Sequence, residues 1–120
     1  MFRVIYFVSS TDRTARFYEK AFGARRMKPP AAQDYPPEDW IQVKTGSVQI
    51  GFHRLGFLKP KNKRPENPFK LVFKVADVAK KRKELLRMGI SMTKIWALEP
   101  RGSICDGWDP EGNRFQIADR

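Results

Sequence analysis

The sequence is poor in the residues that bind transition metals or crosslink a chain. Its 120 residues contain one cysteine, Cys105, and one histidine, His53. A single cysteine can neither form an internal disulfide nor supply a thiolate cluster, so a disulfide scaffold and a zinc finger are excluded. A lone histidine also excludes an HExxH metal motif.

Long apolar runs are missing, and acidic residues are few. The longest apolar stretches, such as residues 4–8, are far shorter than the roughly 20 residues that cross a bilayer, and no signal-type block follows Met1. We therefore expect a cytoplasmic protein without a membrane segment. Lysine and arginine number 24 against 13 acidic residues, a net charge of +11. This surplus favours anionic partners, from nucleic acid to a small acidic ligand.

The sequence does contain an internal repeat. Residues 2–10 align with residues 69–77 at an offset of 67, and both segments read as strands. Helical patterns follow, over about 11–22 and about 77–88. A polar residue suited to N-capping precedes each helix, and a glycine suited to ending it follows. Each half therefore begins as a strand followed by a helix.

Further strands are expected after each helix. The patterns predict them at about 24–28, 40–44 and 47–53 in the first half, and at about 91–96, 103–108 and 114–118 in the second. A Pro/Ala/Asp-rich loop is expected over 29–39. The predicted fold class is α+β, with two βαβββ modules that form a curved, half-barrel mixed sheet with the helices outside. We expect one domain over 1–120, with module 1 at about 1–56, a linker at about 57–68 and module 2 at about 69–120.

Strand alternation separates two faces of the predicted sheet. Val4, Tyr6 and Val8 form a uniformly apolar set suited to packing under a helix. The opposite face is more polar, and it carries Arg3, Phe7, Trp40, Gln42, Lys44, Gln49, His53, Lys70, Val72, Arg114 and Gln116.

Two motifs carry a family resemblance that covers essentially the whole chain. Phe17-Tyr18 is followed by Ala21-Phe22-Gly23 at the end of the first helix, and the last hairpin contains Trp108-Asp109-Pro110-Glu111-Gly112-Asn113. The chain thereby resembles the vicinal oxygen chelate superfamily, which includes glyoxalase I, bleomycin-resistance proteins, fosfomycin-resistance enzymes and extradiol dioxygenases. The resemblance implies a small-molecule site in the cup formed by the curved strands, and a homodimer.

The resemblance also indicates where metal ligands would lie. The family's ligand positions correspond to Arg3, Gln49, Lys70 and Gln116 in this chain. Cationic lysine and arginine cannot donate a lone pair to a metal ion, and two neutral amides make a poor site. We therefore predict no metal and no other cofactor, as in the bleomycin-resistance-like, metal-free branch. Whether the protein catalyses a reaction stays open.

The sequence predicts that the cup binds a small anionic or polar aromatic molecule, in a sequestration or resistance role. Charge would come from Arg3 and Lys70, hydrogen bonds from Gln49 and Gln116, and apolar walls from Phe7, Trp40 and Val72, with His53 and Arg114 on the same face. One alternative is a glyoxalase-like or dioxygenase-like enzyme with an atypical site. A second is a basic nucleic-acid-binding module that uses the lysine-rich segments 59–64 and 80–83.

Overall fold

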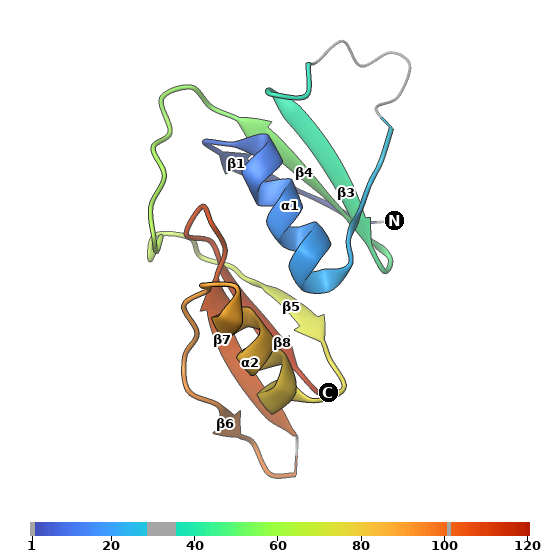
Figure 1. Ribbon diagram of the computed structural model, residues 1–120, viewed down its shortest axis with the longest axis vertical. Coiled ribbons are helices and arrows are strands. Elements are labelled where there is room, and N and C mark those ends of the chain that lie inside the picture. The colour runs from blue at the N-terminus through green and yellow to red at the C-terminus, as the bar shows by residue number, and fades with distance from the viewer. Residues whose placement is uncertain (1, 29–35, 101) are drawn as a thin grey trace. The chain divides into compact units, whose positions relative to one another are not determined.

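The computed structural model describes residues 2–28, 36–100 and 102–120. The chain divides into two compact units, Met1–Pro60 and Lys61–Arg120, which are considered separately. In each unit a helix lies on one face of a four-stranded sheet (Figure 1). Within the described ranges, no helix is long and apolar enough to span a membrane.

Unit 1 contains the first βαβββ module. Its elements are β1 (Phe2–Val8), α1 (Thr11–Phe22), β2 (Arg25–Arg26), β3 (Trp40–Thr45) and β4 (Val48–Arg54). The strand order is β1-β4-β3-β2, with β1 parallel to β4 and the other pairs antiparallel. The strands predicted at 40–44 and 47–53 are confirmed, and β2 is shorter than predicted. Most of the predicted loop at 29–39 lies outside the described residues.

The first helix begins and ends where its capping residues predict. The side chain of Ser10 accepts a hydrogen bond from the backbone N–H of Arg13. Gly23 ends the helix at φ 65°, a left-handed conformation that favours glycine. The buried side of α1 packs on the sheet, where the rings of Tyr18 and Phe52 stack at 5.6 Å between centroids. This contact fixes which face of the sheet lies under α1.

Unit 2 repeats the order, with a shorter first strand, a shorter helix and a shorter last strand. Its elements are β5 (Leu71–Lys74), α2 (Val78–Arg87), β6 (Trp96–Ala97), β7 (Ser103–Trp108) and β8 (Arg114–Ala118), in the strand order β5-β8-β7-β6. The predicted strands at 103–108 and 114–118 are confirmed, so the fold class is α+β with two βαβββ modules.

The strand predicted at 91–96 is mostly absent: two backbone hydrogen bonds join this segment to β7, but side chains satisfy other backbone groups there. The hydroxyl of Thr93 accepts a hydrogen bond from the backbone N–H of Asp106 at 3.0 Å, and Nε of Arg82 donates to the Thr93 carbonyl at 2.8 Å. Between α2 and β6, the described residues form one isolated β-bridge, between Met92 and Gly107. Regular pairing therefore begins late, at Trp96.

The hairpin turn between β7 and β8 follows the predicted motif. The Asp109 carboxylate accepts hydrogen bonds from the backbone N–H groups of Glu111 and Asn113, both at 2.9 Å, and Gly112 has φ 82°. Nε of the buried Arg64 donates to the Glu111 carbonyl at 2.6 Å. Part of the segment expected to be a linker is therefore packed against this turn.

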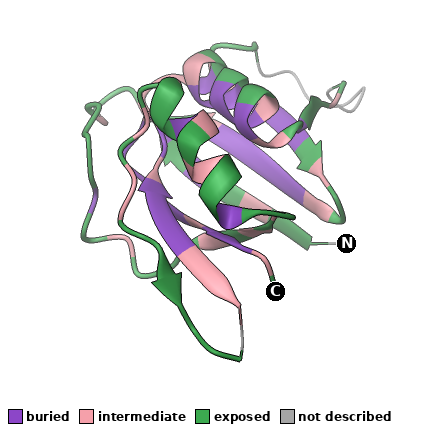
Figure 2. Ribbon diagram, turned by 60° about the horizontal axis from the view of Figure 1, so that its bottom comes forward, coloured by how far each residue is buried: buried purple, intermediate pink, exposed green. Residues whose placement is uncertain are grey.

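Burial separates the two predicted sheet faces in β1, whereas the centres of β3 and β4 are buried on both faces (Figure 2). Tyr6 and Val8 are buried on the face that α1 covers, and Phe115 and Ile117 are buried in the second sheet. On the opposite faces, three apolar residues are about half exposed: Ile5 (47%), Phe7 (55%) and Val72 (55%). The faces without a helix therefore carry both polar groups and accessible apolar surface.

Candidate functional site

A polar cluster lies on the face of the unit 1 sheet away from α1. We define the unit 1 cluster as Arg3, Gln42 and Gln49. Nε and Nη2 of Arg3 both donate to Oε1 of Gln49 at 3.3 Å, and Nε2 of Gln42 donates to the same oxygen at 2.7 Å. The two amides are buried, whereas Arg3 is exposed. The cluster thus presents a guanidinium to solvent above a buried pair of amides.

Aromatic side chains lie farther along the same face. The rings of Phe7 and His53 are 5.8 Å apart between centroids, and those of Trp40 and His53 are 6.0 Å apart. The Trp40 indole covers Gly51, where a Cβ atom would collide with the ring. Because Gly51 pairs with Gln42 and lies two residues from Gln49, the indole extends toward the unit 1 cluster.

A small pocket lies beside the Trp40 indole and the Gln42 amide. Its volume is about 170 Å³, and its lining includes Met27, Pro37, Trp40 and Gln42. Nε1 of Trp40 is buried and has no hydrogen-bond partner among the described residues. A buried indole N–H normally finds an acceptor, so this donor is suited to a polar group of a ligand.

Unit 2 has a polar cluster built around a carboxylate. We define the unit 2 cluster as Lys70, Asp106, Arg114 and Gln116. Oδ2 of Asp106 accepts from Nζ of Lys70 at 2.9 Å and from Nε of Arg114 at 2.7 Å, while Oδ1 accepts from Nε2 of Gln116 at 2.9 Å. Asp106 is only 1% exposed, whereas the side chains of Lys70 and Arg114 are 35% and 44% exposed. The cations therefore shield a buried anion from solvent.

The environment of Asp106 keeps it ionised. Burial alone would raise the pKa of this carboxyl group, because a low-dielectric surrounding disfavours charge. The hydrogen bonds from Lys70, Gln116 and Arg114 act in the opposite sense and hold the pKa below its ordinary value. Asp106 is thus an internal counter-ion at neutral pH.

The strand registers show which positions of the two clusters correspond. Ile5 pairs with Gly51, which pairs with Gln42; Val72 pairs with Gln116, which pairs with Asp106. Ile5 and Val72 each lie five residues before the N-cap of the following helix. Gln42 of unit 1 therefore corresponds to Asp106 of unit 2.

This correspondence differs from the constant offset of 67 expected from the repeat. Arg3 and Lys70 keep that offset, but Gln49 corresponds to Arg114, and Gly51 takes the place of Gln116. The segment from the first strand to the strand before the hairpin causes the change: Ile5 and Gln42 are 37 positions apart, whereas Val72 and Asp106 are 34 apart. The hairpin acts in the opposite sense, because the turn at 109–113 is longer than the two-residue loop between Thr45 and Val48.

The residues that the resemblance assigns to the family's ligand positions do not fit a metal ion. Lys70 is a protonated donor to Asp106, and the Arg3 guanidinium has no lone pair to offer. Gln49 already accepts three hydrogen bonds on one oxygen. In the parts of the chain that the structure describes, no group of three or more His, Cys, Asp or Glu side chains could hold a metal.

The structure brings most of the predicted site residues into local groups. Arg3 contacts Gln49, while Lys70, Arg114 and Gln116 share Asp106; Phe7 and Trp40 both contact His53, and the exposed Val72 pairs with Gln116. Sequence reasoning did not assign Asp106 to the site. Asp106 lies two residues from both Ile104 and Trp108, so the three share one face of the predicted strand, and Asp106 is opposite Gln116 in the predicted hairpin. This spacing is the signal that could have identified its face.

Comparison with known proteins gives a family match. Residues 4–118 match the family model described as a glyoxalase-like domain. A search of curated proteins gives no match.

Similar solved structures share the fold. A complex of the E126Q mutant of the fosfomycin resistance protein FosX from Listeria monocytogenes with Mn(II) and 1S,2S-dihydroxypropylphosphonic acid has a TM-score of 0.75 at 13% identity, covering 98% of this chain and 89% of that chain. A lactoylglutathione lyase from Agrobacterium tumefaciens has a TM-score of 0.68 at 13% identity, covering 98% and 91%. A glyoxalase family protein from Enterococcus faecalis has a TM-score of 0.74 at 18% identity, covering 98% and 95%.

These structural neighbours are below 25% identical, so they support the fold and not a shared activity. The family match extends over nearly the whole chain and agrees with the two βαβββ modules. The chain therefore belongs to the glyoxalase-like domain family, within the vicinal oxygen chelate superfamily.

Proposed function

We propose that unit 1 binds a small anionic aromatic molecule on the sheet face away from α1, without a metal ion. The observation that carries the proposal is the partner of Arg3. Its guanidinium contacts the neutral amide of Gln49, and among the described residues no carboxylate forms an ion pair with it. An anionic ligand would supply the missing negative charge.

The groups around Arg3 favour a ligand that combines an anionic group with an aromatic ring. Nε2 of Gln42 lies 3.4 Å from the sulfur of Met27, and a thioether is a weak acceptor that an oxyanion would improve upon. Trp40 offers an indole face and a buried N–H donor beside a pocket of about 170 Å³. A cavity of about 150 Å³ accommodates a benzene-sized molecule, so the pocket is large enough to receive one ring of an aromatic ligand.

In unit 2, the predicted ligand residues already have an internal anion. Lys70, Arg114 and Gln116 all donate to Asp106, so one of the two cationic charges is neutralised within the cluster. We propose that these residues hold Asp106, and that Arg3 is the main cation for an external ligand. The expected ligand contacts in unit 1 are therefore Arg3, Gln42, Gln49, Trp40 and the neighbouring ring of His53.

The test is calorimetric titration with 2-naphthoate and with its uncharged carboxamide. Naphthoate should bind more tightly, and Arg3→Met should weaken it by about 1–3 kcal/mol, because a charge-assisted hydrogen bond is lost. Arg16→Met is the matched control, since Arg16 is exposed on α1 and pairs with Asp12. Equal affinity for the acid and the amide, or unchanged binding to Arg3→Met, would show that Arg3 does not hold an anion.

We also propose that the protein is a metal-free homodimer. The exposed Ile5 and Phe7 support a further interface, because accessible apolar surface is often covered by a second copy. Light scattering should give twice the chain mass of 14.0 kDa. Elemental analysis should find no stoichiometric transition metal, and chelators should leave Tm unchanged. A monomer would contradict the proposed homodimer, and a retained equivalent of metal would contradict the proposal that the protein is metal-free.

A further inference from the structure

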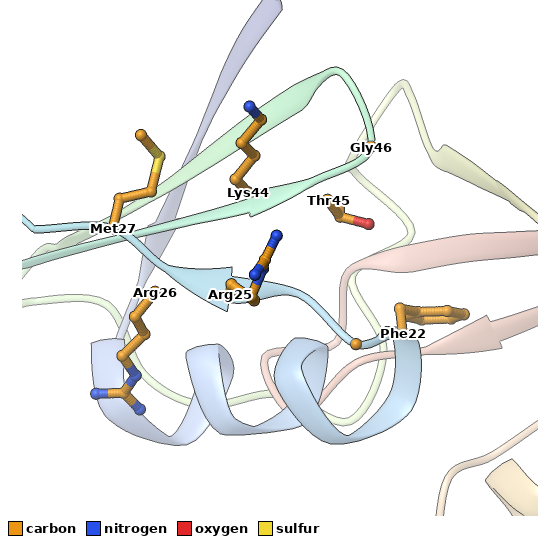
Figure 3. A pocket seen from close by; sticks show the side chains of 8 residues that line it. Phe22, Arg25, Arg26, Met27, Lys44, Thr45 and Gly46 are labelled. Carbon is orange, nitrogen blue, oxygen red and sulfur yellow. The ribbon is translucent and has the colours of Figure 1, made fainter.

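A second pair of cations lies at the β2 edge of unit 1. β2 pairs with β3 so that Arg25 is directly opposite Lys44, and both side chains are exposed. Residues opposite one another on antiparallel strands have Cβ atoms about 5 Å apart. Figure 3 shows Arg25 and Lys44 on the side of the sheet away from α1, whereas Arg26 points toward the helix.

No acidic side chain balances this pair within the described part of the chain. Arg26, the next residue, is held by Asp12 and Glu19 at 2.9 Å each, but Arg25 and Lys44 form no such ion pair. Like charges directly opposite one another destabilise a sheet. The free protein therefore carries an electrostatic cost at this position that a bound anion would remove.

The two cations line an open pocket that is larger than a single ion. Its volume is about 630 Å³, and its lining also includes Phe22, Met27 and Thr45. This volume is within the range of small-molecule sites. Phe22 and Met27 offer apolar surface, and the hydroxyl of Thr45 is a further hydrogen-bond donor.

We propose that this pocket binds a small organic phosphate, with the phosphoryl group between Arg25 and Lys44. Two adjacent cations require about two negative charges for neutralisation. A phosphate monoester carries about −1.5 to −2 at pH 7, whereas a carboxylate carries only one. Phe22 contacts the organic part of the ligand. Lys44 on β3 and Arg3 on β1 both pair with Gln49 on β4, one from each side, so Lys44 and Arg3 lie two strands apart. The proposal does not depend on the function assigned to Arg3.

The first experiment is calorimetric titration with phenyl phosphate at low ionic strength. Lys44→Gln and Arg25→Gln should each weaken binding about tenfold or more, and Lys44→Arg should retain affinity within about threefold. Lys20→Gln makes the same charge change at an exposed position on α1 and should alter affinity less than about twofold. Equal binding by wild type and Lys44→Gln would overturn the proposal.

Two further measurements separate this pocket from the unit 1 cluster. Arg3→Met should change phenyl phosphate affinity less than about threefold; a loss as large as that of Lys44→Gln would place the phosphate at Arg3 and overturn the proposal. Affinity should rise between pH 5 and pH 7.5, because the second ionisation of phosphate lies near pH 6. A flat profile over this interval would contradict recognition of the doubly charged form.

Discussion

The two units use the same strand order but neutralise their cations differently. In unit 2 the carboxylate of Asp106 occupies the centre of the polar cluster, 2.9 Å from Nζ of Lys70. In unit 1 the corresponding residue is Gln42, which donates to Gln49 and leaves the charge of Arg3 without an internal counter-ion among the described residues. The repeats therefore differ in whether the cations of the cluster share an internal carboxylate: Lys70 and Arg114 do, and Arg3 does not.

Removing the internal anion should have the largest effect on stability. Asp106→Ala leaves Lys70 and Arg114 without their shared acceptor, and we expect a loss of about 2–4 kcal/mol in the free energy of unfolding, measured in urea. Glu84→Ala is the control, because Glu84 pairs with Lys81 at the surface of α2 and should cost less than about 0.5 kcal/mol. Equal losses would mean that Asp106 is not a structural counter-ion.

Adding an internal anion to unit 1 should give Arg3 the kind of internal counter-ion that Asp106 provides in unit 2. Gln42→Glu places a carboxylate next to the amide that Arg3 contacts, and we expect 2-naphthoate affinity to fall about tenfold or more. Gln42→Leu removes the amide without adding charge and should cost only a few-fold. If the two variants weaken binding equally, packing rather than charge controls the site.

Acid should weaken unit 2 through Asp106. Because the folded pKa of Asp106 lies below the ordinary value of 3.8, its contribution to stability is complete above about pH 4 and is lost as pH falls through the lower folded pKa. The stability difference between wild type and Asp106→Asn should therefore shrink below about pH 4, as followed by urea unfolding. A difference that stays constant down to pH 2 would argue against an ionised Asp106.

Relieving the repulsion at the β2 edge should have the smallest effect. Lys44→Gln removes one of two like charges that face each other across β2 and β3, so we expect a gain of about 0.2–0.5 kcal/mol in stability at low salt. Because salt screens exposed charges, the gain should decline at high salt. A destabilised variant would indicate that Lys44 has a favourable partner in the folded protein.

Local signals in the sequence predicted most of the fold. The apolar alternation of β1 and the caps of α1 are encoded within a few residues, and the structure confirms both. The strand prediction at 91–96 was mostly wrong, because the hydrogen bonds of this segment involve the side chains of Thr93 and Arg82. The partners of these side chains are set by tertiary packing.

The site was less predictable, because its geometry depends on strand register. The offset of 67 placed Arg3 and Lys70 in corresponding positions, but the segment between β5 and β7 is shorter than that between β1 and β3, and this displaces Gln49 relative to Gln116. Asp106 has no neighbouring partner in the sequence that reveals a buried ion pair. Its role follows only from the pairing of β7 with β8.

The most direct test follows side-chain N–H signals by nuclear magnetic resonance during titration with 2-naphthoate. The account predicts saturable shifts at Nε–H of Arg3 and at the amides of Gln42 and Gln49, with no saturable shift at Arg114 or Gln116. Shifts at Arg114 and Gln116 with an equal or lower midpoint concentration, or the absence of any response at Arg3, would contradict the claim that unit 1 receives the external anion.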